Sequence, residues 1–177
     1  MVTIGGTEAS KVEFSGLVTL RGRTGRGRPP QALFSFTTFY FASNATVPYG
    51  DTVLDIPSNS LKFTVSVKEW PFRDMENSLS FGVDVSFNSR NRRNRVSNRV
   101  EGAGIRRRRR SRAELGDVDV VSPLFAIADG LEVEIASDLR QRENGIVLLT
   151  WTFPSFEGDI VYDPVVNPAN EGIVFYL

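Results

Sequence analysis

The sequence predicts an all-β protein, an antiparallel β-sandwich of jelly-roll or immunoglobulin-like type with about eight or nine strands. Two stretches, 61–68 and 79–87, alternate strictly between apolar and other residues, which is the pattern of a strand with one buried face. Gly, Pro, Asn and Asp separate the β-rich stretches, as in VPYGD and DPVVNPANEG. No segment shows three turns of helical periodicity, so the strands lack crossover helices and are expected to pair antiparallel.

Strands are expected wherever β-branched and aromatic residues gather between turn-forming residues. The stretch 32–41 shifts its alternation near Thr37 and Thr38, which predicts either a bulge or burial on both faces. In chain order, the predicted strands cover 12–20, 32–41, 61–69, 79–88, 131–135, 145–153, 158–163 and 172–177, with another starting at Val118.

The two most regular strands, 61–69 and 79–88, are expected to pair as antiparallel neighbours. The residues between them include Pro71, which cannot continue a strand and therefore marks a connecting loop. Two other stretches, 124–128 and 137–144, are expected to form a short turn at most. With no helix to cover the sheet, a second facing sheet is the simplest way to bury its apolar face.

A core rich in phenylalanine is expected to hold a single domain that covers residues 1–177. The chain has 41% hydrophobic residues, thirteen Phe and no Cys, so this core has to form without disulfides. Burying one Phe contributes roughly 1.5–3 kcal/mol relative to leaving it exposed. The residues expected to be most buried are Phe63, Val65, Phe81, Val83, Val85, Leu149 and Trp151.

The absence of both Cys and His excludes several kinds of chemistry. No thiolate or imidazole is present to bind a metal, and neither a Cys nucleophile nor a Ser-His-Asp triad can form. No apolar run of about eighteen residues occurs, so no transmembrane segment is predicted. The stretch MVTIGGTEASKVEF lacks the basic and apolar regions of a signal peptide.

The net charge is zero, but the charges are strongly segregated along the chain. The stretch 90–112 contains eleven arginines and one acidic residue and so carries +10, whereas residues 113–177 carry −10. Residues 89–116, the Arg-rich segment, are predicted to be a flexible loop inserted between strands, because they are too polar to bury much surface. Replacing 90–112 by a short linker is therefore expected to leave the fold intact.

Three interpretations of the Arg-rich segment stay open: a solvated insertion, a contact site for a polyanion, and a site of proteolytic processing. The lack of interleaved aromatic residues for base stacking argues against nucleic acid. A second basic turn, 21–30, alternates Arg with Gly and would extend one basic rim if it lies at the same end of the sandwich. The candidate polyanion-binding residues are Arg90, Arg92, Arg93, Arg95, Arg106, Arg107, Arg108, Arg109, Arg110 and Arg112, and in the turn Arg21, Arg23, Arg26 and Arg28.

Carboxylates provide a second group of candidate sites. Glu157, Asp159 and Asp163 lie in one turn-rich stretch and are candidate ligands for calcium, which takes oxygen ligands. Calcium is the one cofactor that the sequence suggests. These acids, with Asp117 and Asp119, are also the residues from which a glycosidase would draw its two carboxylates. Ordinary turn chemistry explains the same residues without any ligand.

Two further features carry functional alternatives. Trp70 and Phe72 lie in a predicted loop and either anchor a partner or plug the open end of the sandwich; plugging is favoured, since exposed apolar patches are uncommon. Asn44 begins a glycosylation sequon, Asn-Ala-Thr, between two predicted strands, which points towards a secreted protein.

Taken together, these features predict a non-enzymatic recognition or structural module of an extracellular or cell-surface protein, with a protein or glycan partner. The alternative is a glycan- or polyanion-binding module that uses the Arg-rich loops. A third function, from a different class, is a carboxylate-based glycosidase.

Overall fold

Sixteen antiparallel strands build the described part of the chain, which is residues 1–19, 30–86, 96–101, 110–115, 118–142 and 146–168 of a computed structural model. These residues contain no helix, so the predicted all-β antiparallel sandwich is confirmed. The expected count of eight or nine strands is wrong, because bends divide some strands and further short strands are present. The strands are β1 Val2–Ile4, β2 Thr7–Thr19, β3 Gln31–Phe41, β4 Ala45–Tyr49, β5 Thr52–Ile56, β6 Ser60–Lys68, β7 Leu79–Ser86, β8 Val96–Glu101, β9 Arg110–Leu115, β10 Val118–Pro123, β11 Phe125–Ala128, β12 Leu131–Glu134, β13 Ala136–Gln141, β14 Ile146–Phe153, β15 Asp159–Tyr162 and β16 Val165–Pro168.

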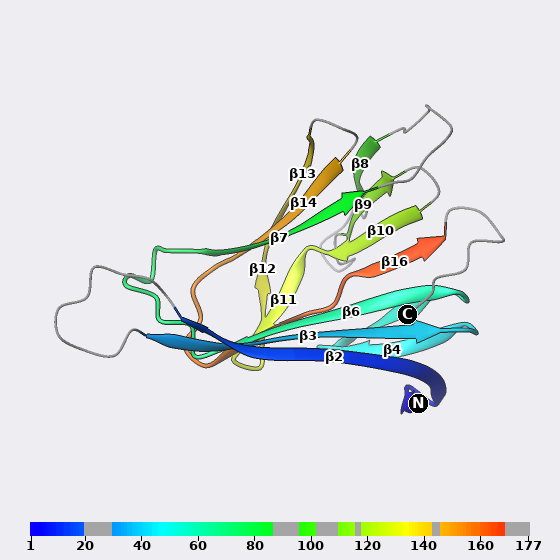
Figure 1. Cartoon of the computed structure of the whole chain (residues 1–177), viewed down its shortest axis with the longest axis horizontal. Coiled ribbons are helices and arrows are strands. Elements are labelled where there is room, and N and C mark those ends of the chain that lie inside the picture. The colour runs from blue at the N-terminus through cyan, green and yellow to red at the C-terminus, as the bar shows by residue number, and fades with distance from the viewer. Residues whose placement is uncertain (20–29, 87–95, 102–109, 116–117, 143–145, 169–177) are drawn as a thin grey trace.

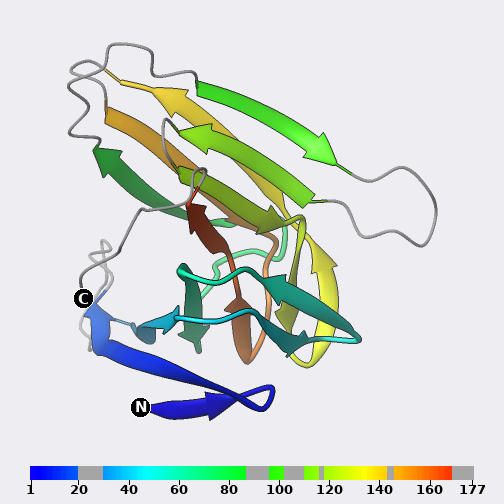
Figure 2. The same cartoon turned by 90° about the vertical axis from the view of Figure 1, so that its right-hand side faces the viewer.

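The strands form two facing sheets and a separate hairpin. The large sheet has the order β1-β2-β3-β6-β16-β10-β9-β8, with β11, β12 and β15 off this path, and the small sheet has the order β13-β14-β7. Figure 1 shows β13, β14 and β7 of the small sheet above β6 and β3, with β10 and β9 of the large sheet between the ends of β7 and β16. Figure 2 shows the β1–β2 hairpin at the outer edge of the large sheet, beside the N-terminus.

Bends in the large sheet occur where the sequence places proline. β10 ends at Pro123, and Asp163 and Pro164 separate β15 from β16; proline has no N–H to donate to the ladder. The chain nevertheless continues in the same direction beyond each bend. The stretches 124–128 and 137–144, expected to be turns, largely form β11 and β13 instead, because neighbouring strands supply the pairing that their short sequences do not reveal.

The predicted pairing of 61–69 with 79–88 is wrong. β6 pairs with β3, β15 and β16 in the large sheet, whereas β7 pairs with β14 in the small sheet. The residues between β6 and β7 therefore cross from one sheet to the facing one. The apolar faces of β6 and β7 do not lie side by side in one sheet, and Phe63 and Val65 of β6 line the same space between the sheets as Phe81 and Val83 of β7.

A second core lies on the other face of the large sheet. The β4–β5 hairpin covers that face with Val47, Tyr49, Leu54 and Ile56, which pack with residues of the sheet such as Phe41. This cover explains why Thr37 and Thr38 are both buried. Because β3 pairs with β6 in an unbroken register, the phase shift in 32–41 reflects burial on both faces and not a bulge.

Part of the Arg-rich segment forms strands, which corrects the prediction of a loop over the whole of residues 89–116. Val96–Glu101 and Arg110–Leu115 form β8 and β9, which extend the large sheet beyond β10. Ala113 and Leu115 belong to the main core, because β9 alternates between buried small or apolar residues and half-buried charged ones. Replacing 90–112 by a linker would delete β8 and half of β9, so the structure argues against the expectation of an unchanged fold. The rest of the segment lies outside the described residues.

The predicted core residues face the interior, but to different depths. Val65, Leu149 and Trp151 are buried, as expected. Phe63, Phe81, Val83 and Val85 are only half-buried, although they lie on the inner faces of their sheets. The inner faces therefore leave a space between them, and these four residues line it.

Candidate functional site

A cavity of about 440 Å³ lies between the two sheets. Strands of both sheets line it: β3, β6, β10 and β16 of the large sheet, and β7 and β14 of the small sheet. All but one of its lining residues are apolar. They are Phe36, Leu61, Phe63, Val65, Phe81, Val83, Asp84, Val85, Val118, Val120, Leu149, Trp151, Pro164 and Val166.

The alternation of the strands explains why this cavity is apolar. On β7, Phe81, Val83 and Val85 point towards the large sheet, while Gly82 and Asp84 are exposed. Because successive side chains of a strand point to opposite faces, these three apolar residues of β7 all face the cavity and the residues between them face solvent. Phe81 contacts Phe34 and Phe36 of the large sheet, with ring centroids 5.7 and 6.4 Å apart, while Val83 and Val85 line the remaining space.

Aromatic rings form a continuous part of the wall. Phe36 stacks on Phe63 at 5.3 Å between ring centroids, and Phe81 stacks on Trp151 at 6.0 Å. Trp151 Nε1 donates a hydrogen bond of 3.1 Å to Ser122 Oγ, so its polar atom is satisfied and its ring is free to contact apolar matter.

The single charge among the lining residues lies at the rim. Asp84 is exposed, and its Oδ2 lies 3.3 Å from Nη1 of Arg142, which is also exposed. A pocket that presents rings and aliphatic groups, with no nucleophile or acid within it, selects ligands by shape and apolar surface.

The predicted polyanion-binding arginines lie mostly outside the described residues. Arg110 and Arg112 are the two that the structure describes, and both are on β9. Arg112 forms a hydrogen-bonded ion pair with the buried Asp119 of β10, so this guanidinium neutralises a charge of its own sheet. Arg110 lies beside a small cleft with Asp55 and Asn167.

The three candidate calcium ligands are not brought together. Asp163 is buried beside Lys62 in the second core, whereas Glu157 is exposed and Asp159 lies on β15. Among the described residues, no group of three or more acids is placed to hold a metal ion. Of the acids named for glycosidase chemistry, Asp119 is engaged by Arg112, and Asp117 lies outside the described residues.

Asp129 organises the acidic loop instead. It occupies the two-residue turn between β11 and β12 together with Gly130, and both have positive φ (52° and 79°), as a tight β-hairpin turn requires. Its carboxylate accepts hydrogen bonds of 2.7–2.9 Å from the backbone N–H groups of Glu157, Gly158 and Asp159. These bonds tie the β11–β12 turn to the loop before β15 and lower the pKa of Asp129.

Asp129→Asn is expected to lower the melting temperature at neutral pH. A carboxyl group whose pKa is depressed by folding stabilises the protein above its unfolded pKa and loses this effect as the pH falls through the folded pKa. The wild type and Asp129→Asn should therefore differ at pH 7 and converge in acid. Thermal melts at a series of pH values test this, with the exposed Asp51→Asn as control. A difference that persists unchanged into strong acid would contradict it.

Trp70 and Phe72 pack against the main core, and both are half-buried. Phe72 makes an edge-to-face contact with the buried Phe156 at 5.2 Å. This arrangement favours the plugging interpretation over a partner anchor. Asn44 is exposed at the start of β4, and its Oδ1 accepts a hydrogen bond from the N–H of Ser58.

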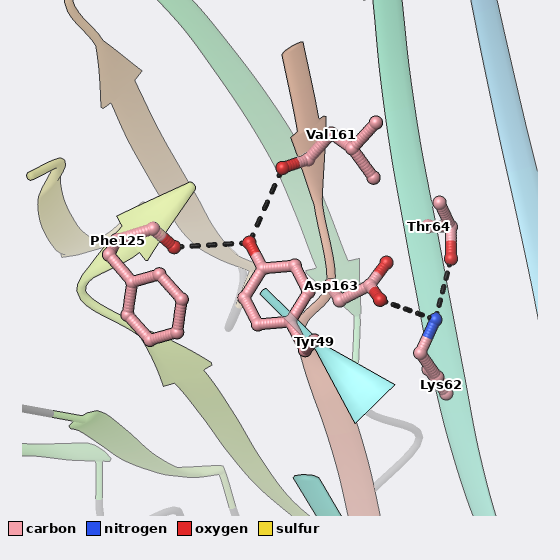
Figure 3. A network of polar contacts seen from close by, with 6 residues as sticks. All are labelled: Tyr49, Lys62, Thr64, Phe125, Val161 and Asp163. Atoms are coloured by element: carbon pink, nitrogen blue, oxygen red, sulfur yellow. Dashed lines mark hydrogen bonds and ion pairs between the residues drawn. The ribbon is translucent and has the colours of Figure 1, made fainter. Parts of the chain in front are cut away.

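A polar cluster that the sequence did not suggest lies in the second core (Figure 3). Lys62, expected on the wet face of its strand, is buried because the β4–β5 hairpin covers it. Its Nζ lies 2.7 Å from Asp163 Oδ2 and donates to Thr64 Oγ1 at 2.7 Å. Tyr49 donates to the carbonyl of Phe125 at 3.1 Å. Burial, and after it the nearby Asp163, raise the pKa of Tyr49, so its hydroxyl stays protonated.

Comparisons with known proteins give no match: no protein-family model, no curated protein and no solved structure is similar to this chain. In the described ranges, no helix has the length and apolar character needed to cross a membrane.

Proposed function

We propose that this chain is a non-enzymatic β-sandwich recognition module of an extracellular or cell-surface protein, and that it binds an apolar small molecule between its sheets. The cavity between the sheets is the observation that carries this proposal. Its volume of about 440 Å³ lies within the usual range for ligand sites, and thirteen of its fourteen lining residues are apolar.

The size and chemistry of the cavity define its ligand class. A dry apolar cavity of roughly 150 Å³ holds one benzene molecule, so the space between the sheets has room for about three such groups. The aromatic rings of Phe63, Phe81 and Trp151 favour an uncharged molecule with flat or chain-like apolar parts. A charged ligand would lose its hydration within the cavity without gaining an opposite charge there.

Support for a module outside the cell is limited to the sequon. Asn44 and Thr46 of the Asn-Ala-Thr sequence are both exposed, at a strand start where a glycan would project into solvent. Enzyme chemistry finds no support in the lining of the cavity, since Asp84 at the rim is the one ionisable group among the residues that line it.

Titration with diphenylhexatriene, an uncharged apolar dye that fluoresces out of water, tests the proposal. The folded protein is expected to bind the dye in a saturable way and to show quenching of tryptophan fluorescence by the dye at Trp151. Val83→Phe, which adds bulk to an inward-facing position of β7, should weaken binding at least about tenfold, because the new ring occupies the ligand's volume.

The matched control is Val53→Phe, which adds the same bulk to an exposed position of β5, a strand that contributes no lining residue. This variant should bind the dye as the wild type does. Equal affinity in Val83→Phe and wild type would place the dye elsewhere and contradict the proposal, as would the absence of saturable binding.

A further inference from the structure

The polar cluster under the β4–β5 hairpin brings a lysine and an aspartate of adjacent strands into contact. Lys62 lies on β6 and Asp163 at the bend between β15 and β16, which pair with β6 on either side of that bend. The side chains retain only 5% and 8% of their surface exposure, and Nζ lies 2.7 Å from Oδ2. The pair is therefore shielded from water. Figure 3 shows Lys62 directed at both Asp163 and Thr64. Neither Lys62 nor Asp163 lines the cavity between the sheets.

As separate ions, these two groups are unequally satisfied: the Lys62 ammonium contacts Asp163 Oδ2 and Thr64 Oγ1, whereas one oxygen of Asp163 is left over. Asp163 Oδ1 is buried and has no hydrogen-bond partner among the described residues. The ring of Phe39, with its centroid 5.1 Å from Lys62 Nζ, adds a cation–π contact to the ammonium but offers nothing to Asp163 Oδ1. Removing two charges from water is costly, and a pair with an unsatisfied carboxylate oxygen recovers this cost incompletely. A neutral product of the same two groups would not have this cost.

We propose that Lys62 and Asp163 condense into an intramolecular amide that links β6 covalently to the β15–β16 strand. The fold holds the amine next to the carboxyl group, so the two groups need not first be brought together from solution. Groups held in this way react much faster than the same groups on separate molecules. The site is thus a self-modification site, and it is independent of the ligand-binding cavity.

The reaction balances without any co-reactant. One proton passes from the Lys62 ammonium to Asp163 Oδ2, which leaves a neutral amine and a neutral carboxyl group. The nitrogen lone pair attacks Cγ, the N–C bond forms, and the C–O bond to the protonated oxygen breaks. That oxygen leaves as water with the transferred proton and a second proton from nitrogen. The third ammonium proton stays on the amide nitrogen, and no atom is oxidised or reduced.

The surroundings suit the product. Thr64 Oγ1, which already accepts a hydrogen bond from Lys62 Nζ, is placed to accept one from the amide N–H. The remaining carbonyl oxygen corresponds to Oδ1, and an uncharged oxygen costs less to bury than a carboxylate oxygen does. Tyr49 keeps its proton and its bond to the carbonyl of Phe125, so the hairpin above the pair need not move.

Intact mass spectrometry of the full, denatured chain tests the proposal. The wild-type protein, folded and incubated at neutral pH, is expected to be lighter than its sequence by the mass of one water molecule. Digestion should yield a branched peptide that joins the segment around Lys62 to the segment around Asp163. Lys62→Arg keeps a cation but has no amine for this reaction, so its mass should equal that of its sequence.

Two controls separate this reaction from other losses of water. Lys68→Arg, at an exposed position on the same strand, should keep the mass deficit. The Asp129–Gly130 sequence can also lose water by succinimide formation, and that loss would remain in Lys62→Arg. A wild-type mass equal to that of the sequence overturns the proposal even if the variants do not fold, and so does a deficit that persists in Lys62→Arg.

Discussion

Replacing Lys62 with methionine is expected to lower the free energy of unfolding by about 3–5 kcal/mol, because it removes the partner of Asp163, whether ion-paired or amide-linked, and leaves a buried carboxylate uncompensated. In the wild type, Lys62 Nζ lies 2.7 Å from Asp163 Oδ2, and both side chains are almost fully shielded from water. Methionine has a similar length and packs well, so the lost volume is small and the measured change reports the loss of the link between Lys62 and Asp163. Urea denaturation of both proteins measures the difference.

The same substitution at Lys68 provides the matched control. Lys68 lies on the same strand but is exposed, and surface substitutions of this kind change stability by about 0.5 kcal/mol or less. Equal stability of Lys62→Met and Lys68→Met would show that the β4–β5 hairpin does not bury the pair. The second core would then need another arrangement.

Phe153→Ala is expected to cost about 3–5 kcal/mol, the usual range for deleting a fully buried ring. Phe153 ends β14, is 1% exposed, and packs edge to face on Tyr162 of the large sheet at 5.4 Å between ring centroids. Its ring therefore joins the two sheets where they lie close together. For a domain of this size, the melting temperature should fall by about 6–20 °C.

Phe81→Ala provides the comparison for this prediction. Phe81 is an aromatic residue of the same core, but it is half-buried and lines the cavity. Truncating it enlarges a space that already exists and removes fewer packing contacts, so the loss of stability should be smaller than that of Phe153→Ala. The reverse order would mean that the space between the sheets is filled in solution.

Periodicity predicted which residues face inwards, but not which strands are neighbours. The alternation in 61–68 and 79–87 identified β6 and β7, and the side chains that face the interior are the expected ones. Their assignment as a hairpin failed because strand pairing depends on long-range contacts that alternation does not encode. The Arg-rich strand β9 was missed for a related reason: Ser111, Ala113 and Leu115 suffice to bury one face, although the average composition is polar.

The candidate site was only partly accessible to sequence reasoning. Phe63, Phe81 and Val83 were correctly expected on the inner faces, yet the space between them depends on how two sheets pack, which no local pattern specifies. Lys62 was expected in water because its neighbours alternate as in a half-exposed strand, and only the β4–β5 hairpin, packing from elsewhere in the chain, buries it. The Asp-Gly turn at Asp129 is a recognisable hairpin signal, but its three backbone partners come from a distant loop.

A crystal structure determined under xenon pressure tests the open apolar space between the sheets most directly. Xenon enters dry apolar cavities and is visible by its strong scattering. The predicted result is xenon density bounded by Phe63, Val83 and Leu149, in a cavity of about 440 Å³. An interior in which protein side chains fill this space, with no xenon between β6 and β7, would contradict the account.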